Sequence, residues 1–238
     1  MDPTDNGWEN SAAAWIADQG EAGDFSRQYV LDAPMLARIR QGRAEGRFAS
    51  ALDVGSGEGR FCRILGAEGI AATGLEPTPT LRATARNRDP EGCYVDGRAE
   101  ALPFADASFD LVISYLTLID IDGIDQAIAE MARVLAPGGS LLIANLNGFS
   151  TAGEWRRQMD GSPYFRLDHY LEPRTEWVSW RGISIRNWHR PMQSYMQLLI
   201  GAGLRLAHFE EPRPSGGGKH AERFARVPYF HIMEWVKA

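Results

Sequence analysis

Apolar residues in the first 150 positions alternate between helical spacing and short buried runs. Helical spacing predicts two helices, over 8–18 and 24–40, with Pro34 starting or kinking the second. Strands alternating with helices then predict right-handed βαβ units and an open parallel sheet. The predicted strands are 48–54, 70–76, 92–97, 109–116 and 140–147, and helices follow the glycine-rich stretch 55–59 and cover 78–88 and 124–135, the last stopped by Pro137-Gly138-Gly139.

The pattern changes after residue 148. Residues 150–190 are rich in tryptophan, arginine and tyrosine, and we interpret them as an insert. Within it, 177–189 alternates like a strand, with one face formed by Trp177, Ser179, Arg181, Ile183 and Ile185. A helix over 191–202 should follow, and 205–211 should then pair with 229–237 as a closing antiparallel hairpin, with Gly216-Gly217-Gly218 in the loop between them.

Composition narrows the class of protein. The formal net charge of −6 over 238 residues disfavours a nucleic-acid partner. No apolar run is long enough for a bilayer, so we expect no membrane contact, and the acidic start lacks a secretory pattern. Cys62 and Cys93 are too few for a disulfide framework or a cysteine zinc site, so we expect a cytoplasmic protein. An arginine group interspersed with tryptophans is interpreted as a solvated face: Arg174, Arg181, Arg186 and Arg190.

A glycine-rich loop, Asp53-Val54-Gly55-Ser56-Gly57-Glu58-Gly59, lies where a strand turns into a helix. Glycines there allow a tight turn and close approach of a ligand to the backbone. Glu76, at the end of the second strand, is placed to accept hydrogen bonds from both ribose hydroxyls of an adenosine group. Arg60 stands where a dinucleotide site would have its third glycine, and the acidic loop suits a ligand with an ammonium and a sulfonium group.

Five motifs follow one another in a characteristic order: ALDVGSGEGRF, the Glu76 position, AEALPF (99–104), SFDLVIS (108–114) and MARVLAPGGSLLIANL (131–146). Residues 48–147 thereby resemble the class I S-adenosylmethionine-dependent methyltransferases, in particular small-molecule methyltransferases with AEALPF and RVLxPGG motifs. The resemblance implies a Rossmann-like, doubly wound α/β fold. Its seven-stranded sheet would have the order 3-2-1-4-5-7-6, with strand 7 antiparallel.

The resemblance also implies a donor site for S-adenosylmethionine, which would leave as S-adenosylhomocysteine. Gly55, Gly57 and Gly59 would line the methionine part, and Asp53 would contact its amino group. Arg98 replaces an aspartate that binds adenine in many relatives, so backbone groups would recognise adenine here. The remaining donor residues would be Glu76 at the ribose, Pro77 beside it, Ala99 and Glu100 at the adenine, Tyr115 and Leu116 flanking the donor, and Arg27, which either pairs with the donor carboxylate or lies on the surface.

We expect four segments: an N-terminal helical cap (1–45), the donor-binding core (46–147), a substrate lid insert with its helix (148–203), and the closing antiparallel strands (204–238). Among these, the lid is expected to bind the acceptor. His189, in Asn187-Trp188-His189-Arg190-Pro191, is the first candidate for a general base, because histidine titrates near neutral pH. It would alternatively fix its own loop by hydrogen bonds.

Asp120 is the second catalytic candidate, either as the base or to orient an acceptor amine, although Asp120 and Asp122 would equally cap the next helix. A magnesium site formed by these acids and Asn147 is a weaker alternative, so no metal is expected. Tryptophans outside the core sheet, Trp8 and Trp15 among them, either stack on the acceptor or form a small core beneath the lid. Substrate contacts are expected from Asn145, Trp155, His169, Tyr170 and Trp188.

These residues favour an enzyme that methylates an O or N atom of a small molecule. Two alternatives stay open: a methyltransferase acting on RNA or protein, and a non-catalytic nucleoside-binding module. The sequence leaves the acceptor and the oligomeric state undetermined.

Overall fold

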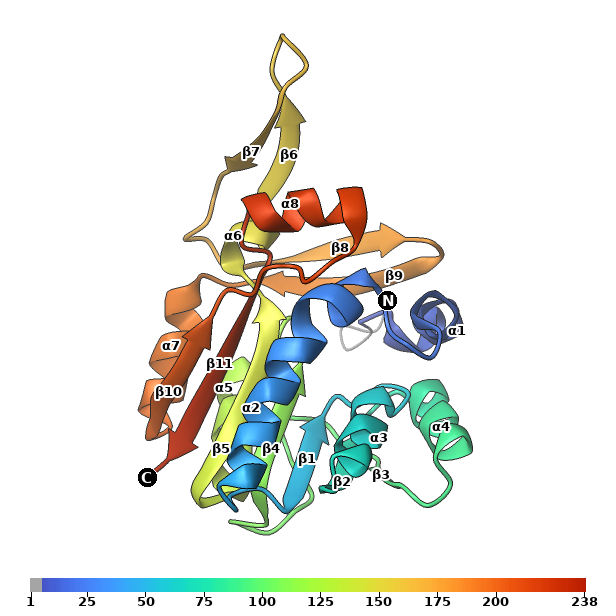
Figure 1. Ribbon diagram of the computed structural model, residues 1–238, viewed down its shortest axis with the longest axis vertical. Coiled ribbons are helices and arrows are strands. Elements are labelled where there is room, and N and C mark those ends of the chain that lie inside the picture. Colours follow the sequence, from blue (N-terminus) through green and yellow to red (C-terminus); the bar gives the residue numbers. More distant parts are fainter. Residues whose placement is uncertain (1–5) are drawn as a thin grey trace.

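A seven-stranded sheet forms the centre of the computed structural model, which describes residues 6–238 (Figure 1). Its order, β10-β11-β5-β4-β1-β2-β3, confirms the predicted 3-2-1-4-5-7-6 arrangement, with the last strand of the chain antiparallel to both neighbours. The other pairs are parallel. The strands are β1 (Ser50–Val54), β2 (Ala71–Leu75), β3 (Cys93–Val95), β4 (Phe109–Tyr115), β5 (Leu135–Leu146), β10 (Leu204–Glu210) and β11 (Phe230–Lys237).

Helices cover both faces of this sheet, which explains why β4 and β5 are apolar almost throughout. On one face, Met35 and Ile39 of α2 and Leu65 of α3 pack on the strands. On the other face, Met131 of α5 and Leu199 of α7 do so. The helices are α1 (Trp8–Gln19), the π-helix η1 (Arg27–Leu31), α2 (Asp32–Ala44), α3 (Arg60–Ala67), α4 (Pro79–Arg88), α5 (Ile124–Val134), α6 (Gly148–Thr151), α7 (Met192–Gly201), the 3₁₀ turn η2 (Gly218–His220) and α8 (Ala221–Arg226).

The carboxyl ends of the parallel strands all point to one end of the molecule, and the remaining elements gather there (Figure 1). Two separate hairpins rise from this end, β6 (Gly153–Arg157) with β7 (Pro163–Leu167) and β8 (Arg174–Trp180) with β9 (Ile183–His189). Helix α1 lies beside β9, while α2 belongs to the sheet packing. The expected division into four segments stays a prediction, and residues 1–5 of the first segment lie outside the described residues.

The prediction that 177–189 alternates as one strand is wrong, because this segment contains the turn between β8 and β9. Arg181 and Gly182 both have positive φ, +44° and +83°, and form the two-residue turn between β8 and β9. Because Trp180 pairs with Ile183, the faces exchange at the turn, and Trp177 lies on the opposite face from Ile183 and Ile185. The prediction applied one alternation across the turn and so assigned to one face residues that lie on opposite faces of the hairpin.

Two predicted boundaries also differ. Helix α5 ends at Val134, and Pro137-Gly138-Gly139 lies within β5, where the pairing of β4 with β5 shifts between Leu135 and Ser140. This tripeptide is therefore a bulge in a strand. The predicted helix 24–40 is present as a continuous helical stretch over 25–44, but Arg27–Leu31 within it form a π-helical turn before α2. Pro34, the third residue of α2, has no N–H to donate to the carbonyl four residues earlier, which fits a wider turn just before it.

Candidate functional site

A cavity lies at the carboxyl ends of β1, β2 and β4, with α1 on its open side. Its space, including the open mouth, is about 980 Å³, which is in the range of small-ligand sites. The structure brings together at this cavity eleven of the residues expected from the sequence: Arg27, Asp53, Gly55, Gly57, Glu76, Pro77, Ala99, Glu100, Tyr115, Leu116 and Asp120.

The glycine-rich loop forms the floor of the cavity. Gly55 has a φ of +77° and Gly57 a φ of +56°, a region that favours glycine. A Cβ on Gly55 would overlap the side chain of Thr117, which lies in the loop after β4. The backbone N–H of Gly55 donates to Leu75 O over 2.8 Å and so ties the loop to the end of β2. Glycine is thus needed here for both conformation and space.

Glu76 is buried at the end of β2 and faces this loop. Its Oε2 accepts from the Gly57 N–H over 2.9 Å, and its Oε1 accepts from the Thr78 N–H over 2.8 Å. Burial raises the pKa of Glu76, and the hydrogen bonds from Thr78 and Gly57 oppose that rise. The Thr78 side chain also hydrogen-bonds to Glu76, so three donors use three of the about four acceptor positions of the carboxylate and leave one for a ligand hydroxyl group.

Asp53, at the end of β1, is a second buried carboxylate in the cavity wall. Its Oδ2 lies 3.6 Å from Cys62 Sγ, while Oδ1 has no hydrogen-bond partner among the described residues. Burial raises its pKa to about 7, with a further rise from Glu76. A buried carboxylate oxygen without a partner is costly unless a ligand satisfies it, and an ammonium group would do so.

A network behind Tyr115 fixes another wall. The Tyr115 hydroxyl donates to Asp32 Oδ1 over 2.8 Å, and Asp32 also pairs with Arg60. Phe61 stacks on the Tyr115 ring with centroids 4.8 Å apart. Arg60 therefore has a structural role in this network. The next residue, Leu116, has a φ of +58°, a strained conformation held at the edge of the cavity.

Helix α1 contributes two tryptophans that sequence reasoning did not assign to the donor site. Trp8 and Trp15 both line the cavity, and their rings meet edge to face with centroids 5.8 Å apart. Trp15 lies over Gly57, and the Arg27 guanidinium lies 5.5 Å from its ring centroid. The spacing of seven between the two tryptophans, which places them on one helix face, was the available signal.

Gly59 is the one expected donor residue that does not line the cavity. It has a φ of +79° and precedes the first turn of α3. A Cβ there would overlap the Tyr94 ring. Packing of Tyr94 against the back of the loop therefore explains why this position is a glycine.

His189 also lies outside the cavity lining, and the structure gives it a different environment from that of a base. Its Nε2 donates to the Tyr170 carbonyl over 2.8 Å, so its Nδ1, 2.6 Å from Thr151 Oγ1, accepts. Burial lowers its pKa. The two ring nitrogens thus join β9 to α6 and to the loop before β8. This agrees with the alternative expectation that His189 fixes its own loop by hydrogen bonds.

The five expected substrate residues are likewise absent from the cavity lining. Asn145 is fully buried in β5, opposite His231 of β11. His169 is exposed and lies 3.1 Å from Glu172. The other three make protein contacts: Trp155 Nε1 donates to Tyr229 Oη, Trp188 Nε1 donates to Asp122, and Tyr170 Oη accepts from the Met192 N–H.

Residues 6–238 contain no group of three or more histidine, cysteine, aspartate or glutamate side chains arranged to hold a metal ion. Asp122 pairs with Arg186 and accepts from Trp188, and Asn147 caps α6 and donates to Glu211 over 2.7 Å. Over the same described residues, no helix combines the length and apolar character needed to cross a bilayer.

Comparisons with known proteins agree with this geometry. Residues 52–143 match a methyltransferase domain family. The malonyl-[acyl-carrier protein] O-methyltransferase of Erwinia pyrifoliae is 36% identical over 137 residues, which cover 58% of this chain and 52% of that protein. The demethylmenaquinone methyltransferase of Tropheryma whipplei is 35% identical over 98 residues, which cover 40% of this chain and 41% of that protein. The chain thus spans about half the length, or less, of these relatives.

The fold recurs in a solved S-adenosylmethionine-dependent methyltransferase from Mesorhizobium loti. The TM-score is 0.73 at 23% identity, and the match covers 87% of this chain and all of that one. Residues 52–143 thus match a methyltransferase domain, and the chain has the fold of solved S-adenosylmethionine-dependent methyltransferases.

Proposed function

We propose that the protein transfers a methyl group from S-adenosylmethionine to an O or N atom of a small-molecule acceptor and releases S-adenosylhomocysteine. The observation that carries this proposal is the pair of buried carboxylates, Asp53 and Glu76, on either side of the glycine-rich loop in one cavity. An adenosine donor that carries an ammonium and a sulfonium group complements both.

The charges of the cavity support the assignment of the donor's parts. Glu76 keeps acceptor capacity for the ribose, and Asp53 has an oxygen that no described residue hydrogen-bonds, which suits the amino group. Arg27 lines the same cavity and is positioned to pair with the donor carboxylate. A diphosphate would meet the acidic side chains of Asp53 and Glu58 in this loop, which disfavours a dinucleotide.

A small acceptor is favoured because α1 covers the cavity with Trp8 and Trp15. The relatives named above act on a malonyl group held by a carrier protein and on demethylmenaquinone, according to their names. A net charge of −6 disfavours RNA as a partner. The free thiols of Cys62 and Cys93 are compatible with a cytoplasmic location.

Calorimetric titration with S-adenosylhomocysteine tests the donor site. Glu76→Ala should weaken binding by about 2 kcal/mol, roughly 30-fold, because charge-assisted hydrogen bonding to the ribose is lost. Glu176→Ala, which removes an exposed carboxylate from β8, should leave affinity within twofold.

Two results would contradict the proposal. One is the absence of heat and of any melting-temperature shift when the wild-type protein meets millimolar donor or product. The other is donor binding without transfer of labelled methyl to any component of a metabolite extract, which would support the nucleoside-binding module instead.

A further inference from the structure

The loop that leaves β4, residues 116–122, is held in place by β9 and the residue that follows it. The Trp188 N–H donates to Ile119 O over 2.6 Å. The guanidinium of Arg190, which is buried, donates to Leu118 O over 3.0 Å and to Ile121 O over 2.6 Å. These bonds use backbone carbonyls along most of the loop, so the loop is fixed relative to the hairpin.

Two aspartates on this loop have different surroundings. Asp122 does not line the cavity. Its carboxylate pairs with Arg186 and accepts from the Trp188 indole N–H over 2.6 Å. Asp120 lines the cavity. Its Oδ1 accepts from Asn187 Nδ2 over 2.5 Å. The loop therefore presents one carboxylate to the cavity and uses the other to attach the hairpin.

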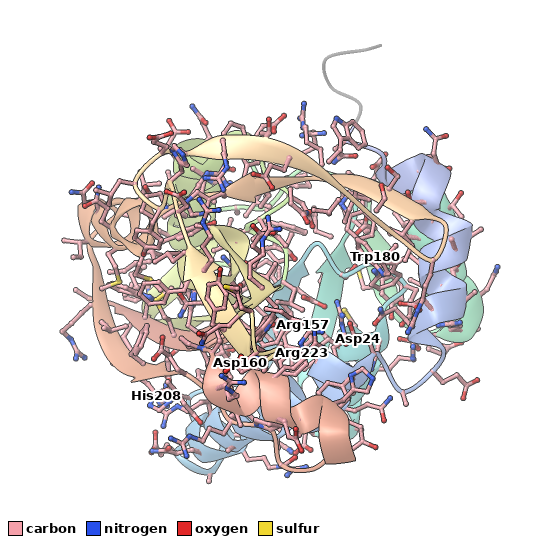
Figure 2. All side chains as sticks on the ribbon, turned by 90° about the horizontal axis from the view of Figure 1, so that it is seen from above. Asp24, Arg157, Asp160, Trp180, His208 and Arg223 are labelled. Carbon is pink, nitrogen blue, oxygen red and sulfur yellow. The ribbon has the colours of Figure 1, made fainter. Side chains whose placement is uncertain are left out.

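Asp120 is held from two sides by elements outside the core sheet. Asn187 belongs to β9, and Trp8, whose side chain also hydrogen-bonds to the Asp120 carboxylate, belongs to α1. Figure 2 looks onto this end of the molecule and shows the β8–β9 hairpin passing over the strand ends toward α1, with Trp180 near its tip. Ion pairing of Arg181 with Asp18 joins the hairpin tip to α1.

The charges that act on Asp120 suit a group that exchanges a proton. Burial raises its pKa to about 8, and hydrogen bonds from Trp8 and Asn187 oppose the rise. Among the charged groups that face it, Glu76 from the end of β2 raises the pKa further and Arg27 from η1 lowers it. A carboxylate in this range is a stronger base than an exposed aspartate and is still substantially ionised near neutral pH once a cation lies beside it.

We propose that Asp120 accepts the proton that the acceptor loses on methylation, with Asn187 and Trp8 as positioning residues for its carboxylate. The acceptor atom is then a hydroxyl oxygen or an amine nitrogen, and not a carboxylate oxygen, which has no proton to lose at neutral pH. This inference rests on the methyl transfer proposed above.

The step balances without another reactant. The acceptor oxygen or nitrogen forms a bond to the methyl carbon, and the carbon–sulfur bond breaks with its electron pair remaining on sulfur. The proton of the acceptor O–H or N–H passes to the Asp120 carboxylate, and from the resulting carboxylic acid to water. An acceptor that arrives as an ammonium ion loses its first proton to the same carboxylate before the attack.

The first experiment uses the donor as its probe and does not depend on the acceptor. S-adenosylmethionine is titrated into the protein at pH 7.5 in two buffers of different ionisation enthalpy, which counts the protons released on binding. The donor's positive charge should lower the pKa of Asp120, so the wild-type protein should release on the order of half a proton more than Asp120→Asn. Asn187→Ala, which removes a hydrogen bond to the charged form, should move the release to higher pH.

The second experiment uses labelled S-adenosylmethionine with phenol, benzylamine and benzoate as simple acceptors. Phenol or benzylamine should be methylated and benzoate should not. Asp120→Asn should lower kcat about 10²- to 10⁴-fold with the S-adenosylhomocysteine affinity unchanged within threefold. Asp125→Asn, which changes an exposed aspartate in the first turn of α5, is the control and should keep kcat within threefold.

Equal proton release by the wild-type protein and Asp120→Asn would overturn the assignment, whatever the acceptor. Methylation of benzoate alone, or methylation by Asp120→Asn at the wild-type rate, would overturn it as well. A wild-type protein that binds no donor at all would instead contradict the function proposed above.

Discussion

The two tryptophan-rich parts outside the core sheet, helix α1 and the inserted hairpins, relate to the cavity in different ways. Helix α1 places Trp8 and Trp15 in the cavity lining, with Trp15 over Gly57 of the glycine-rich loop. In the β8–β9 hairpin, Trp177 and Trp180 are 50% and 39% exposed and do not line the cavity. Similar residue types thus line the cavity in one part and lie outside its lining in the other. Helix α1 contacts the cavity, whereas the β8–β9 hairpin contacts the loop 116–122.

The hairpin nevertheless bears on the site through its contacts with the loop 116–122. Asn187 and Trp188 hold that loop by hydrogen bonds. The β6–β7 hairpin has no residue in the cavity lining. The β8–β9 hairpin therefore contacts the loop beside the cavity without lining the cavity itself.

The sharpest test of this difference uses two glycines with nearly the same backbone conformation. Gly55, in the cavity loop, has a φ of +77°, and Gly161, in the turn of the β6–β7 hairpin, has a φ of +81°. Gly55→Ala should cost about 2–4 kcal/mol in stability and reduce S-adenosylhomocysteine affinity by about 100-fold, because the new Cβ overlaps Thr117 in addition to straining the backbone.

Gly161→Ala is the matched control for that substitution. Nothing lies within 4 Å of a Cβ at this position, so only the strain of about 1 kcal/mol should appear and donor affinity should not change. Thermal unfolding and calorimetric titration measure both quantities. Equal losses of affinity in the two variants would show that the cavity loop has no special role.

A smaller effect should separate the tryptophans of the two regions. Trp15→Ala removes the ring above Gly57 and should weaken S-adenosylhomocysteine binding about tenfold through lost apolar burial. Trp155→Ala removes a hydrogen bond to Tyr229 in the insert and should leave that affinity within twofold. Fluorescence or calorimetric titration decides between them, and a larger loss with Trp155→Ala would reverse our comparison.

The smallest effect should be an opposite response of the two regions to pH without ligand. Asp53 and Asp120 have folded-state pKa values raised to about 7 and about 8, so the stability that their protons contribute is lost as pH rises toward 8. His189 has a lowered pKa because of burial, so its contribution is complete above the unfolded value of about 6.5 and is lost as pH falls below it.

Hydrogen exchange between pH 5.5 and 8.5, corrected for intrinsic rates, measures both trends. Protection of the cavity loops should fall with rising pH, and protection of β9 should increase with pH below 6.5. Asp120→Asn should flatten the first trend and leave the second. Parallel trends in both regions would contradict the assigned environments.

Several of the cavity-lining residues could be predicted from the sequence because they lie at or beside the carboxyl end of a strand whose burial pattern is local. Asp53 is the last residue but one of β1, Glu76 directly follows β2, and Tyr115 ends β4. The carboxyl ends of parallel strands meet at one edge of a sheet. Gly59 shows the limit of this argument. Gly59 has the positive φ expected of a loop glycine. The ring that excludes a side chain at this position belongs to Tyr94, which lies far along the chain.

The acceptor side could not be predicted in the same way. His189 had the right chemistry for a base, but hydrogen bonds to Thr151 and to the Tyr170 backbone occupy its ring. Trp8 and Asn187 showed no pattern that connected them to Asp120, since they approach it from segments near opposite ends of the sequence. Only the packing of α1 and β9 around the loop brings them together.

The sequence by itself determined the sheet, its strand order through a family resemblance, and the glycine-rich loop with its two acids. Strand burial and tight turns are properties of neighbouring residues, so a linear pattern contains them. The tertiary structure alone decided which tryptophans face the cavity, which of Asp120 and Asp122 does so, and that His189 joins elements instead of facing a ligand. Those outcomes depend on contacts between distant segments, and a turn as short as Arg181-Gly182 is enough to exchange the faces of a strand.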